Sequence, residues 1–219
     1  MVGLRLDARS ADGLEVLCLG AHADDIEIGC GGTLLRLARE HPGLSVHWVV
    51  FSGDGDRAEE AKRGAALFLR GVARAQVVVH RFRDGFFPYE GAEIKEAFEE
   101  LASRVAPAVI FTHRGEDRHQ DHRLLSELTW NTFRDHLVLE YEVPKYDGDL
   151  GNPNVFVPLD APTRDGKVSH LMDVFSTQRG KRWFSPETFL GLMRLRGVES
   201  ASPTGYAEGF HVRKSTLLL

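Results

Sequence analysis

Two short segments of the sequence are dense in histidine and carboxylate side chains. The two segments are Gly20–Glu27 (GAHADDIE) and His113–His122 (HRGEDRHQDH). His22 and Asp25 are three residues apart in the first segment, and His119 and His122 are three apart in the second. Side chains at this spacing face the same side of a helical turn. Each segment can therefore present a pair of metal-binding groups.

One histidine and one aspartate from the first segment, with one histidine from the second, supply three ligands for a metal ion. A catalytic zinc typically has three protein ligands and one position open to water. Asp24 could take a proton from that water, and His119 could protonate a leaving group or stabilise an oxyanion. Asp121 could hold His119 in its charged form, since a nearby carboxylate favours imidazolium. The residues thus predict a metal site with its own proton-transfer groups.

Short apolar runs alternate with helical patterns through the first two thirds of the chain. The runs suit strands buried on both faces of a parallel sheet, and the three- and four-residue spacings between them indicate amphipathic helices. The expected strands are Glu15–Gly20, Val46–Phe51, Gln76–His80 and Ala108–Thr112. The expected helices are Gly31–Glu40, Arg57–Gly71, Ala92–Val105 and His119–His136, with Gly71 at the C-cap of the second.

Both polar segments directly follow expected strands, the first and the fourth. In an open α/β sheet the ligand crevice lies beyond the carboxyl ends of the strands, so both segments would face the same rim. Alone, an Asp-Asp pair after a strand is most often a helix cap, and a lone HxxH is most often a solvated helix face. Their combination at one rim favours the metal site.

From about Leu137 the pattern changes. Tyr141–Asn154 is rich in Pro, Gly, Asp and Asn and predicts a long surface loop. The further elements expected are strands at Leu139–Val143 and Val155–Leu159, helices at Lys167–Gln178 and Pro186–Arg196, and an edge strand near Tyr206–Val212. We expect residues 1–219 to form a single domain. Its predicted class is α/β, a Rossmann-like three-layer fold with a mostly parallel sheet, helices on both faces and a C-terminal elaboration.

Composition restricts the class of protein further. The chain has 219 residues, with Lys+Arg 27 against Asp+Glu 32 and a net charge of -5, so it lacks the basic balance of a nucleic-acid binder. Its apolar runs are too short for a membrane span, and its first residues do not resemble a secretion signal. The presence of only two cysteines argues against a disulfide framework. These features predict a cytoplasmic protein that has no membrane span and does not bind nucleic acid.

The two polar segments resemble the signatures of a known family, the LmbE-like (PIG-L) zinc-dependent N-acetyl-sugar deacetylases. AHADDIEIGCGGT at 21–33 is similar to their AHPDDE-type motif, and EDRHQDH at 116–122 is similar to their HPDH motif. Weaker similarity extends to Tyr206–Phe210. Ala23 stands where Pro is commonest, and Gln120 replaces the Pro of the second motif. Neither position supplies a ligand.

The resemblance implies a zinc-dependent hydrolase that removes the acetyl group from an N-acetylglucosamine-type sugar or conjugate, giving a free amine and acetate. It also implies roles for single residues. The ligands of Zn²⁺, or of another divalent metal, would be His22, Asp25 and His122. The catalytic groups would be Asp24 as general base, His119 with Asp121 behind it, and Tyr206 at the oxyanion, while Arg57 would contact substrate.

Two other classes of function stay open. Gly29–Thr33 (GCGGT) is a weak match to the dinucleotide-binding turn of an oxidoreductase, since Leu34 stands where the fingerprint needs glycine. An oxidoreductase of this kind would need an acidic residue at the end of the second strand to bind ribose, and Asp54, within a Gly-rich turn, meets that requirement only loosely. A non-catalytic sugar-binding relative is the other alternative, although pure binding has no need of Asp24 as a base. The sequence leaves open the rest of the amino-sugar substrate and any assembly into a homo-oligomer.

Overall fold

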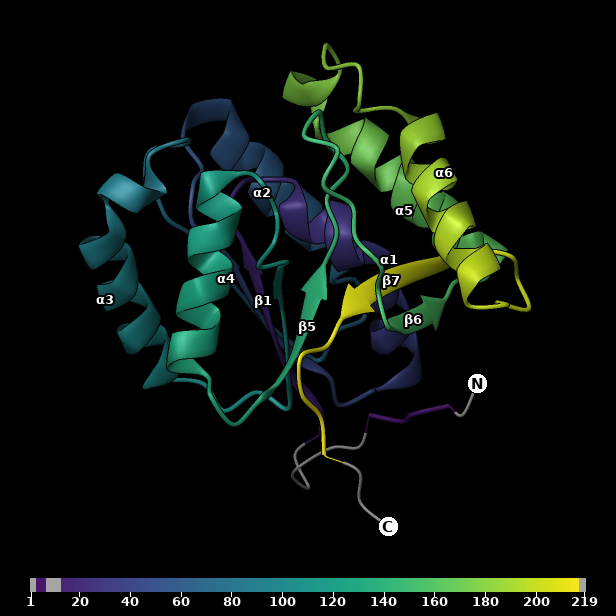
Figure 1. Ribbon diagram of the computed structural model, residues 1–219, viewed down its shortest axis with the longest axis horizontal. Coiled ribbons are helices and arrows are strands. Elements are labelled where there is room, and N and C mark those ends of the chain that lie inside the picture. Colours follow the sequence, from purple (N-terminus) through teal and green to yellow (C-terminus); the bar gives the residue numbers. More distant parts are fainter. Residues whose placement is uncertain (1–2, 7–12, 217–219) are drawn as a thin grey trace.

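A seven-stranded sheet forms the centre of the computed structural model, which describes residues 3–6 and 13–216 (Figure 1). The strands are β1 (Glu15–Gly20), β2 (Ser45–Val50), β3 (Arg74–Val79), β4 (Val109–His113), β5 (Leu137–Tyr141), β6 (Val155–Pro158) and β7 (Ala207–His211). Their order across the sheet is β3-β2-β1-β4-β5-β7-β6. Strands β1 to β5 pair in parallel, whereas β7 runs antiparallel to both β5 and β6.

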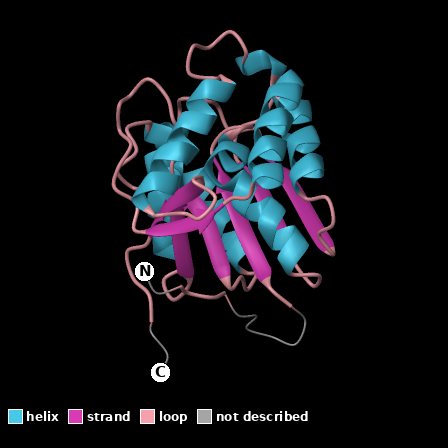
Figure 2. Cartoon of the chain, turned by 90° about the vertical axis from the view of Figure 1, so that its right-hand side faces the viewer, coloured by secondary structure: helices cyan, strands magenta, loops and turns pink. Residues whose placement is uncertain are grey.

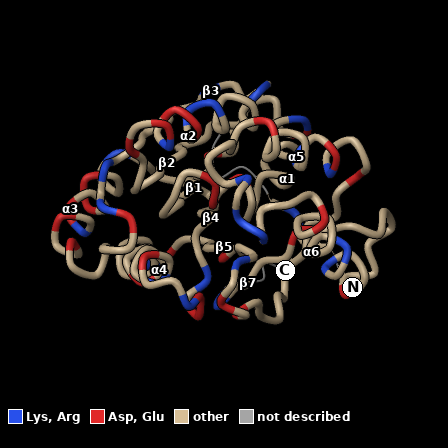
Figure 3. The backbone as a smooth tube through the Cα atoms, turned by 90° about the horizontal axis from the view of Figure 1, so that it is seen from above, with Lys and Arg blue, Asp and Glu red and all other residues tan. Residues whose placement is uncertain are grey.

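Helices cover both faces of this sheet. The α-helices are α1 (Asp25–Glu40), α2 (Gly55–Phe68), α3 (Gly91–Ala102), α4 (Gln120–Thr132), α5 (Ala161–Val174) and α6 (Pro186–Glu199), and short 3-10 turns span Phe87–Tyr89 and Ser176–Gln178. Seen from above, α3 and α4 lie on one side of the strands and α1, α5 and α6 on the other (Figure 3). In the side view the strands run next to one another with helices along them (Figure 2). The three-layer α/β prediction is confirmed.

Two apolar cores follow from the alternation of side chains along the strands. Val16 and Cys18 of β1 face the layer of α1 and α2, and belong to a core that also contains Trp48. Leu17 and Leu19 face the layer of α3 and α4. Because β1 is buried on both faces, its sequence is a nearly continuous apolar run.

Helix α1 begins at Asp25, not at Gly31 as the sequence analysis expected. The glycines that suggested a turn lie inside the helix, where they allow close packing. A Cβ on Gly29 would lie 2.2 Å from the ring of Tyr141, and one on Gly31 would lie 2.4 Å from the ring of Phe68. The first polar segment is therefore the entry to a helix that packs directly on its neighbours.

Three further expectations about the elements were wrong. Helix α2 ends at Phe68, and Gly71 follows beyond the C-cap with a left-handed φ of 86°. The strand near the C-terminus, β7, is not at the edge, because β6 pairs on its outer side. Helix α5 begins at Ala161, since the side chain of Asp160 accepts a hydrogen bond from the Thr163 amide and caps it.

The order of the strands places the two polar segments together. β1 and β4 are parallel neighbours in the sheet, and the segments leave their carboxyl ends on the same rim. Within the described part of the chain, no helix combines the length and the hydropathy that crossing a membrane requires.

We expect Gly29→Ala to destabilise the protein by about 1–3 kcal/mol, because the added methyl group overpacks the contact of α1 with Tyr141. Gly166→Ala is the matched control, since a Cβ there in α5 meets nothing within 4 Å and should add about 0.5–1 kcal/mol. Urea denaturation of the two variants measures the difference. Equal stability would contradict the close packing of α1.

Candidate metal and catalytic site

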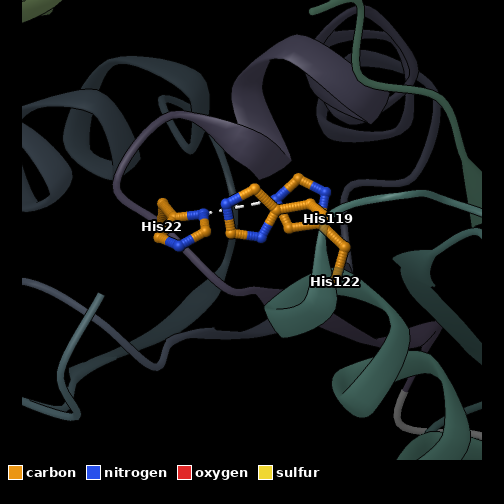
Figure 4. Close-up of side chains that lie close together, drawn as sticks. All are labelled: His22, His119 and His122. Carbon is orange, nitrogen blue, oxygen red and sulfur yellow. Dashed lines mark hydrogen bonds between the residues drawn. The ribbon is translucent and has the colours of Figure 1, made fainter. Parts of the chain in front are cut away.

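The predicted metal ligands come from two adjacent strand ends. His22 lies in the turn after β1, and Asp25 is the first residue of α1. His122 lies in the first turn of α4, for which His119 is the N-cap. The three histidine rings point toward one another across the gap between these segments (Figure 4).

Ligand atoms of three residues form a compact triangle at this point. His22 Nδ1 lies 3.2 Å from His122 Nε2, Asp25 Oδ2 lies 3.3 Å from the first nitrogen, and Asp25 Oδ1 lies 3.5 Å from the second. The three residues are only 9%, 3% and 2% exposed, in the order His22, Asp25 and His122. The structure therefore brings together all three ligands that the sequence analysis named.

Hydrogen bonds on the far side of each ring indicate which nitrogen carries the proton. His22 Nε2 lies 3.1 Å from carboxylate oxygens of both Asp121 and Asp84. His122 Nδ1 lies 2.9 Å from Asp117 Oδ2. Because a carboxylate only accepts, these outer nitrogens are assigned the N–H groups. His122 Nε2 then presents a lone pair to His22 Nδ1. Burial would lower the pKa of His22, but hydrogen bonds with Asp121, Asp25 and Asp84 raise it well above its usual value, so Nδ1 carries a second proton that a metal ion would displace.

This donor set fits a divalent metal ion. Zinc–nitrogen bonds of about 2.0–2.1 Å meeting at a tetrahedral angle hold two nitrogens roughly 3.3–3.4 Å apart. The nitrogens of His22 and His122 are 3.2 Å apart, and the Asp25 carboxylate completes a three-ligand set. A metal ion bound here would replace the second proton of His22 and compensate the charge of the nearly buried Asp25 carboxylate.

The protonation states of His122 and Asp25 also suit metal binding. Burial, with the neighbouring His113, lowers the pKa of His122 to about 4, so its imidazole is neutral at pH 7. Burial would raise the pKa of Asp25, but His122 and His113 hold it well below its usual value. Neutral imidazole and ionised carboxylate are the forms that bind metals.

Asp24, the predicted general base, stands beside this triangle as the N-cap residue of α1. Its Oδ1 accepts a hydrogen bond of 2.9 Å from Arg57 Nη2. Its Oδ2 is buried and has no hydrogen-bond partner among the described residues. Burial raises the pKa of the carboxyl group even though Arg57 opposes the shift. Asp24 is thus held by one oxygen while the other is left to react.

His119 and Asp121 are both close to the triangle, but not in the arrangement that the sequence suggested. The Asp121 carboxylate contacts His22 and accepts the amide N–H groups of Gly85 (2.7 Å) and Phe87 (3.1 Å). His119 Nδ1 accepts the Asp121 amide at 3.3 Å, which leaves Nε2 as its donor. Residues two apart on a helix do not face each other, so the carboxylate of Asp121 orients His22 instead of His119. Burial, with the charge on His22, lowers the pKa of His119.

Sequence reasoning missed three residues of this site. His113, the last residue of β4, accepts the Ala21 amide at Nε2 (3.0 Å) and stacks on His122 with ring centroids 3.8 Å apart. Its place at a strand end within the second polar segment was a usable signal, as was that of Asp117. Asp84 comes from the connection after β3, and nothing in its surrounding sequence distinguishes it.

The two remaining predicted residues have different positions. Arg57 reaches the site, where it contacts Asp24 and donates to Thr177 Oγ1 at 3.3 Å. Tyr206 lies immediately before β7, and the guanidinium groups of Arg164 and Arg194 lie 4.5 and 5.6 Å from its ring centroid. The structure therefore places Tyr206 against α5 and α6.

The glycine segment does not form a nucleotide-binding turn. Gly29–Thr33 lies within α1, past its first turn, and all five residues are buried. The amide groups of Gly32 and Thr33 donate to the carboxylate of Glu208. Asp54 caps α2 by accepting the amide of Gly55. The backbone groups that would hold a phosphate are thus used within the fold.

Comparison with known proteins identifies the family of this chain. The model of the family described as "PIG-L: GlcNAc-PI de-N-acetylase" matches residues 17–133, more than half of the chain. The chain therefore belongs to the PIG-L family. Among curated proteins, "Uncharacterized deacetylase YaiS" of Escherichia coli (strain K12) is 33% identical over 142 residues, which cover 59% of this chain and 74% of that protein.

Solved structures show the same fold at low sequence identity. The conserved protein TT1542 from Thermus thermophilus has a TM-score of 0.72 at 22% identity, covering 94% of this chain and 97% of its own. N,N'-diacetylchitobiose deacetylase from Pyrococcus horikoshii has a TM-score of 0.65 at 19% identity, and the match covers 92% of this chain and 84% of that protein. GalB, the 4-carboxy-2-hydroxymuconate hydratase from Pseudomonas putida KT2440, has a TM-score of 0.76 at 19% identity, and the match covers 94% of this chain and 98% of that protein. The fold by itself thus does not determine the reaction.

We expect His122→Ala to abolish stoichiometric binding of a divalent metal, because it removes one corner of the triangle. His41→Ala is the control, since His41 lies at the opposite end of α1 from Asp25. Elemental analysis after dialysis against trace metal measures the ratio of metal to protein. A full metal complement in His122→Ala would contradict the assignment of this ligand.

Proposed function

We propose that this protein is a zinc-dependent N-deacetylase that hydrolyses the acetamide of an N-acetylglucosamine-type sugar or conjugate. The observation that carries the proposal is the buried triangle of His22, Asp25 and His122 with the free Oδ2 of Asp24 beside it. Membership of the PIG-L family and the similarity to YaiS support a deacetylase. The two buried, free cysteines support a cytoplasmic location.

His22, Asp25 and His122 would hold the zinc ion. When bound, zinc supplies a Lewis acid that polarises the acetyl carbonyl and lowers the pKa of water from ~15.7 towards ~7. Asp121 and Asp117 hold the two imidazoles by their outer nitrogens. Outer carboxylates of this kind fix the ring orientation and make the ligand more basic.

Asp24 is the group suited to accept the proton of the attacking water. Arg57 holds Oδ1 of Asp24 by a hydrogen bond, and Oδ2 has no hydrogen-bond partner among the described residues. Burial raises the pKa of the carboxyl group, which makes the carboxylate a stronger base than it would be in water. The proton taken up there can pass to the amide nitrogen as the C–N bond breaks. The products are then a free sugar amine and acetate.

His119 would stabilise the charge that develops on the carbonyl oxygen. Its Nδ1 is occupied by the amide of Asp121, so Nε2 carries the proton and can donate to that oxygen. We also propose that Arg57, which is only partly buried, contacts the substrate with donors that Asp24 and Thr177 leave free. For Tyr206 we propose the oxyanion role that the family resemblance implies, which would require its ring to leave Arg164 and Arg194.

The proposed reaction is tested by incubating the zinc-loaded protein with a panel of N-acetylglucosamine conjugates. We expect equal amounts of free amine and acetate from at least one member, and no release after zinc is removed with a chelator. Binding of the sugars without release would identify a non-catalytic binding protein. Thermal stabilisation by NAD would instead favour the nucleotide-binding alternative.

We expect Asp24→Asn to retain zinc but to lower kcat by about 10²–10⁴-fold, because the amide cannot accept the proton. Asp135→Asn changes an exposed carboxylate beyond the C-terminal end of α4, whereas His122 lies in the first turn of that helix, and it serves as the control for charge and expression. Zinc stoichiometry and turnover are measured on the same preparations. Turnover within threefold of the unmodified protein would remove Asp24 from the role of base.

A further inference from the structure

A chain of buried charged groups leads from His122 to the loop between β5 and β6. Asp117 Oδ2 lies 2.9 Å from His122 Nδ1 and 2.9 Å from Lys145 Nζ. Lys145 Nζ also lies 2.6 Å from Asp149 Oδ2. The side chains of Asp117, Lys145 and Asp149 are only 6%, 9% and 5% exposed.

Asp117 fixes the second polar segment as well as His122. Its Oδ1 accepts the amide of His119 at 2.8 Å, while Oδ2 holds the imidazole of His122. A carboxylate behind a ligating histidine sets both the tautomer and the direction of the lone pair. Displacement of Asp117 would therefore turn His122 Nε2 away from His22.

Lys145 of the loop forms ion pairs with both Asp117 and Asp149. Two nearly buried carboxylates, those of Asp117 and Asp149, converge on its ammonium group. Without it they would face each other as like charges away from water, and the loop would move to relieve them. The position of Asp117 thus depends on a lysine of the loop.

The loop is fastened at a second point along the same segment. Asp149 Oδ2 accepts the amide of Arg118 at 2.7 Å, and the Asp149 carbonyl accepts from Arg114 Nη1, also at 2.7 Å. On its other side, the hydroxyl of the exposed Tyr146 accepts the amide of Arg182 at 3.1 Å. The loop therefore links the segment that carries His122 to the segment that follows the Ser176–Gln178 turn.

We propose that Asp117 and Lys145 are positioning residues that couple the order of the 142–154 loop to metal binding at His122. The coupling rests on the proposed zinc site. Zinc fixes His122, His122 fixes Asp117, and Asp117 holds Lys145 and the loop in place. Since coupling is reciprocal, the ordered loop in turn strengthens the binding of zinc.

Hydrogen exchange of the loop amides, with and without saturating zinc, tests the coupling. In the unmodified protein we expect zinc to slow the exchange of residues 145–150 about tenfold. In Lys145→Met the zinc-dependent slowing should fall below threefold. Lys181→Met, which removes an exposed lysine from the neighbouring segment, is the control and should keep the full slowing.

Zinc affinity, measured by competition with a chelator, separates coupling from a purely structural role. Asp117→Asn should weaken zinc binding about 10–100-fold. Lys145→Met combined with Asp149→Asn leaves the net charge unchanged, and should weaken zinc binding about tenfold, the factor by which zinc protects the loop. A loop that was merely destabilised would exchange faster while zinc affinity stayed unchanged.

Two results would overturn the coupling alone. One is zinc binding to the unmodified protein without any slowing of exchange in the loop. The other is full zinc affinity in the charge-neutral double variant. Failure of the unmodified protein to bind zinc would overturn the proposed function and the coupling together, so the two failures are distinguishable.

Discussion

Two imidazoles and a carboxylate converge in space that is almost closed to water, and either a shared proton or a metal ion must lie between them. His22 Nδ1 lies 3.2 Å from His122 Nε2, and the oxygens of Asp25 lie 3.3 and 3.5 Å from these nitrogens, so a divalent cation bound here would displace the proton between the rings. Much of the fold serves to maintain this convergence. Gly29 lets α1 lie directly on Tyr141, and the parallel pairing of β1 with β4 brings the two segments to one rim.

Carboxylates around the triangle divide into distinct tasks according to their partners. Asp121 and Asp117 each stand behind one imidazole, and both are held in turn, by backbone amides in one case and by Lys145 in the other. Asp24 has no imidazole partner; Arg57 holds one oxygen and burial keeps the other reactive. All three residues are aspartates of two short motifs. Their local contacts decide that Asp24 is suited to acid–base chemistry, whereas Asp117 and Asp121 orient the imidazoles.

The sequence was sufficient to locate this site because its residues follow strands whose carboxyl ends must share a rim. It was not sufficient for details that depend on packing. The start of α1 was misplaced because Gly29 and Gly31 count against a helix by propensity, while their packing against Tyr141 and Phe68 favours one. The inner position of β7 depends on which strand pairs outside it, and no local pattern encodes that choice. Asp84 reaches His22 from a connection that carries no motif.

The most direct test of the metal site is an anomalous difference map, at the zinc absorption edge, from crystals of the zinc-loaded protein. The account predicts one strong peak about 2.0–2.2 Å from His22 Nδ1, His122 Nε2 and the carboxylate of Asp25. Three other groups of donors lie nearby in the described part of the chain, and the map distinguishes them from the triangle. They are His22, His119 and His122; His22, Asp84, His119 and Asp121; and Asp25, His113 and His122. A sole peak among Asp84, His119 and Asp121, with none in the triangle, would contradict the account.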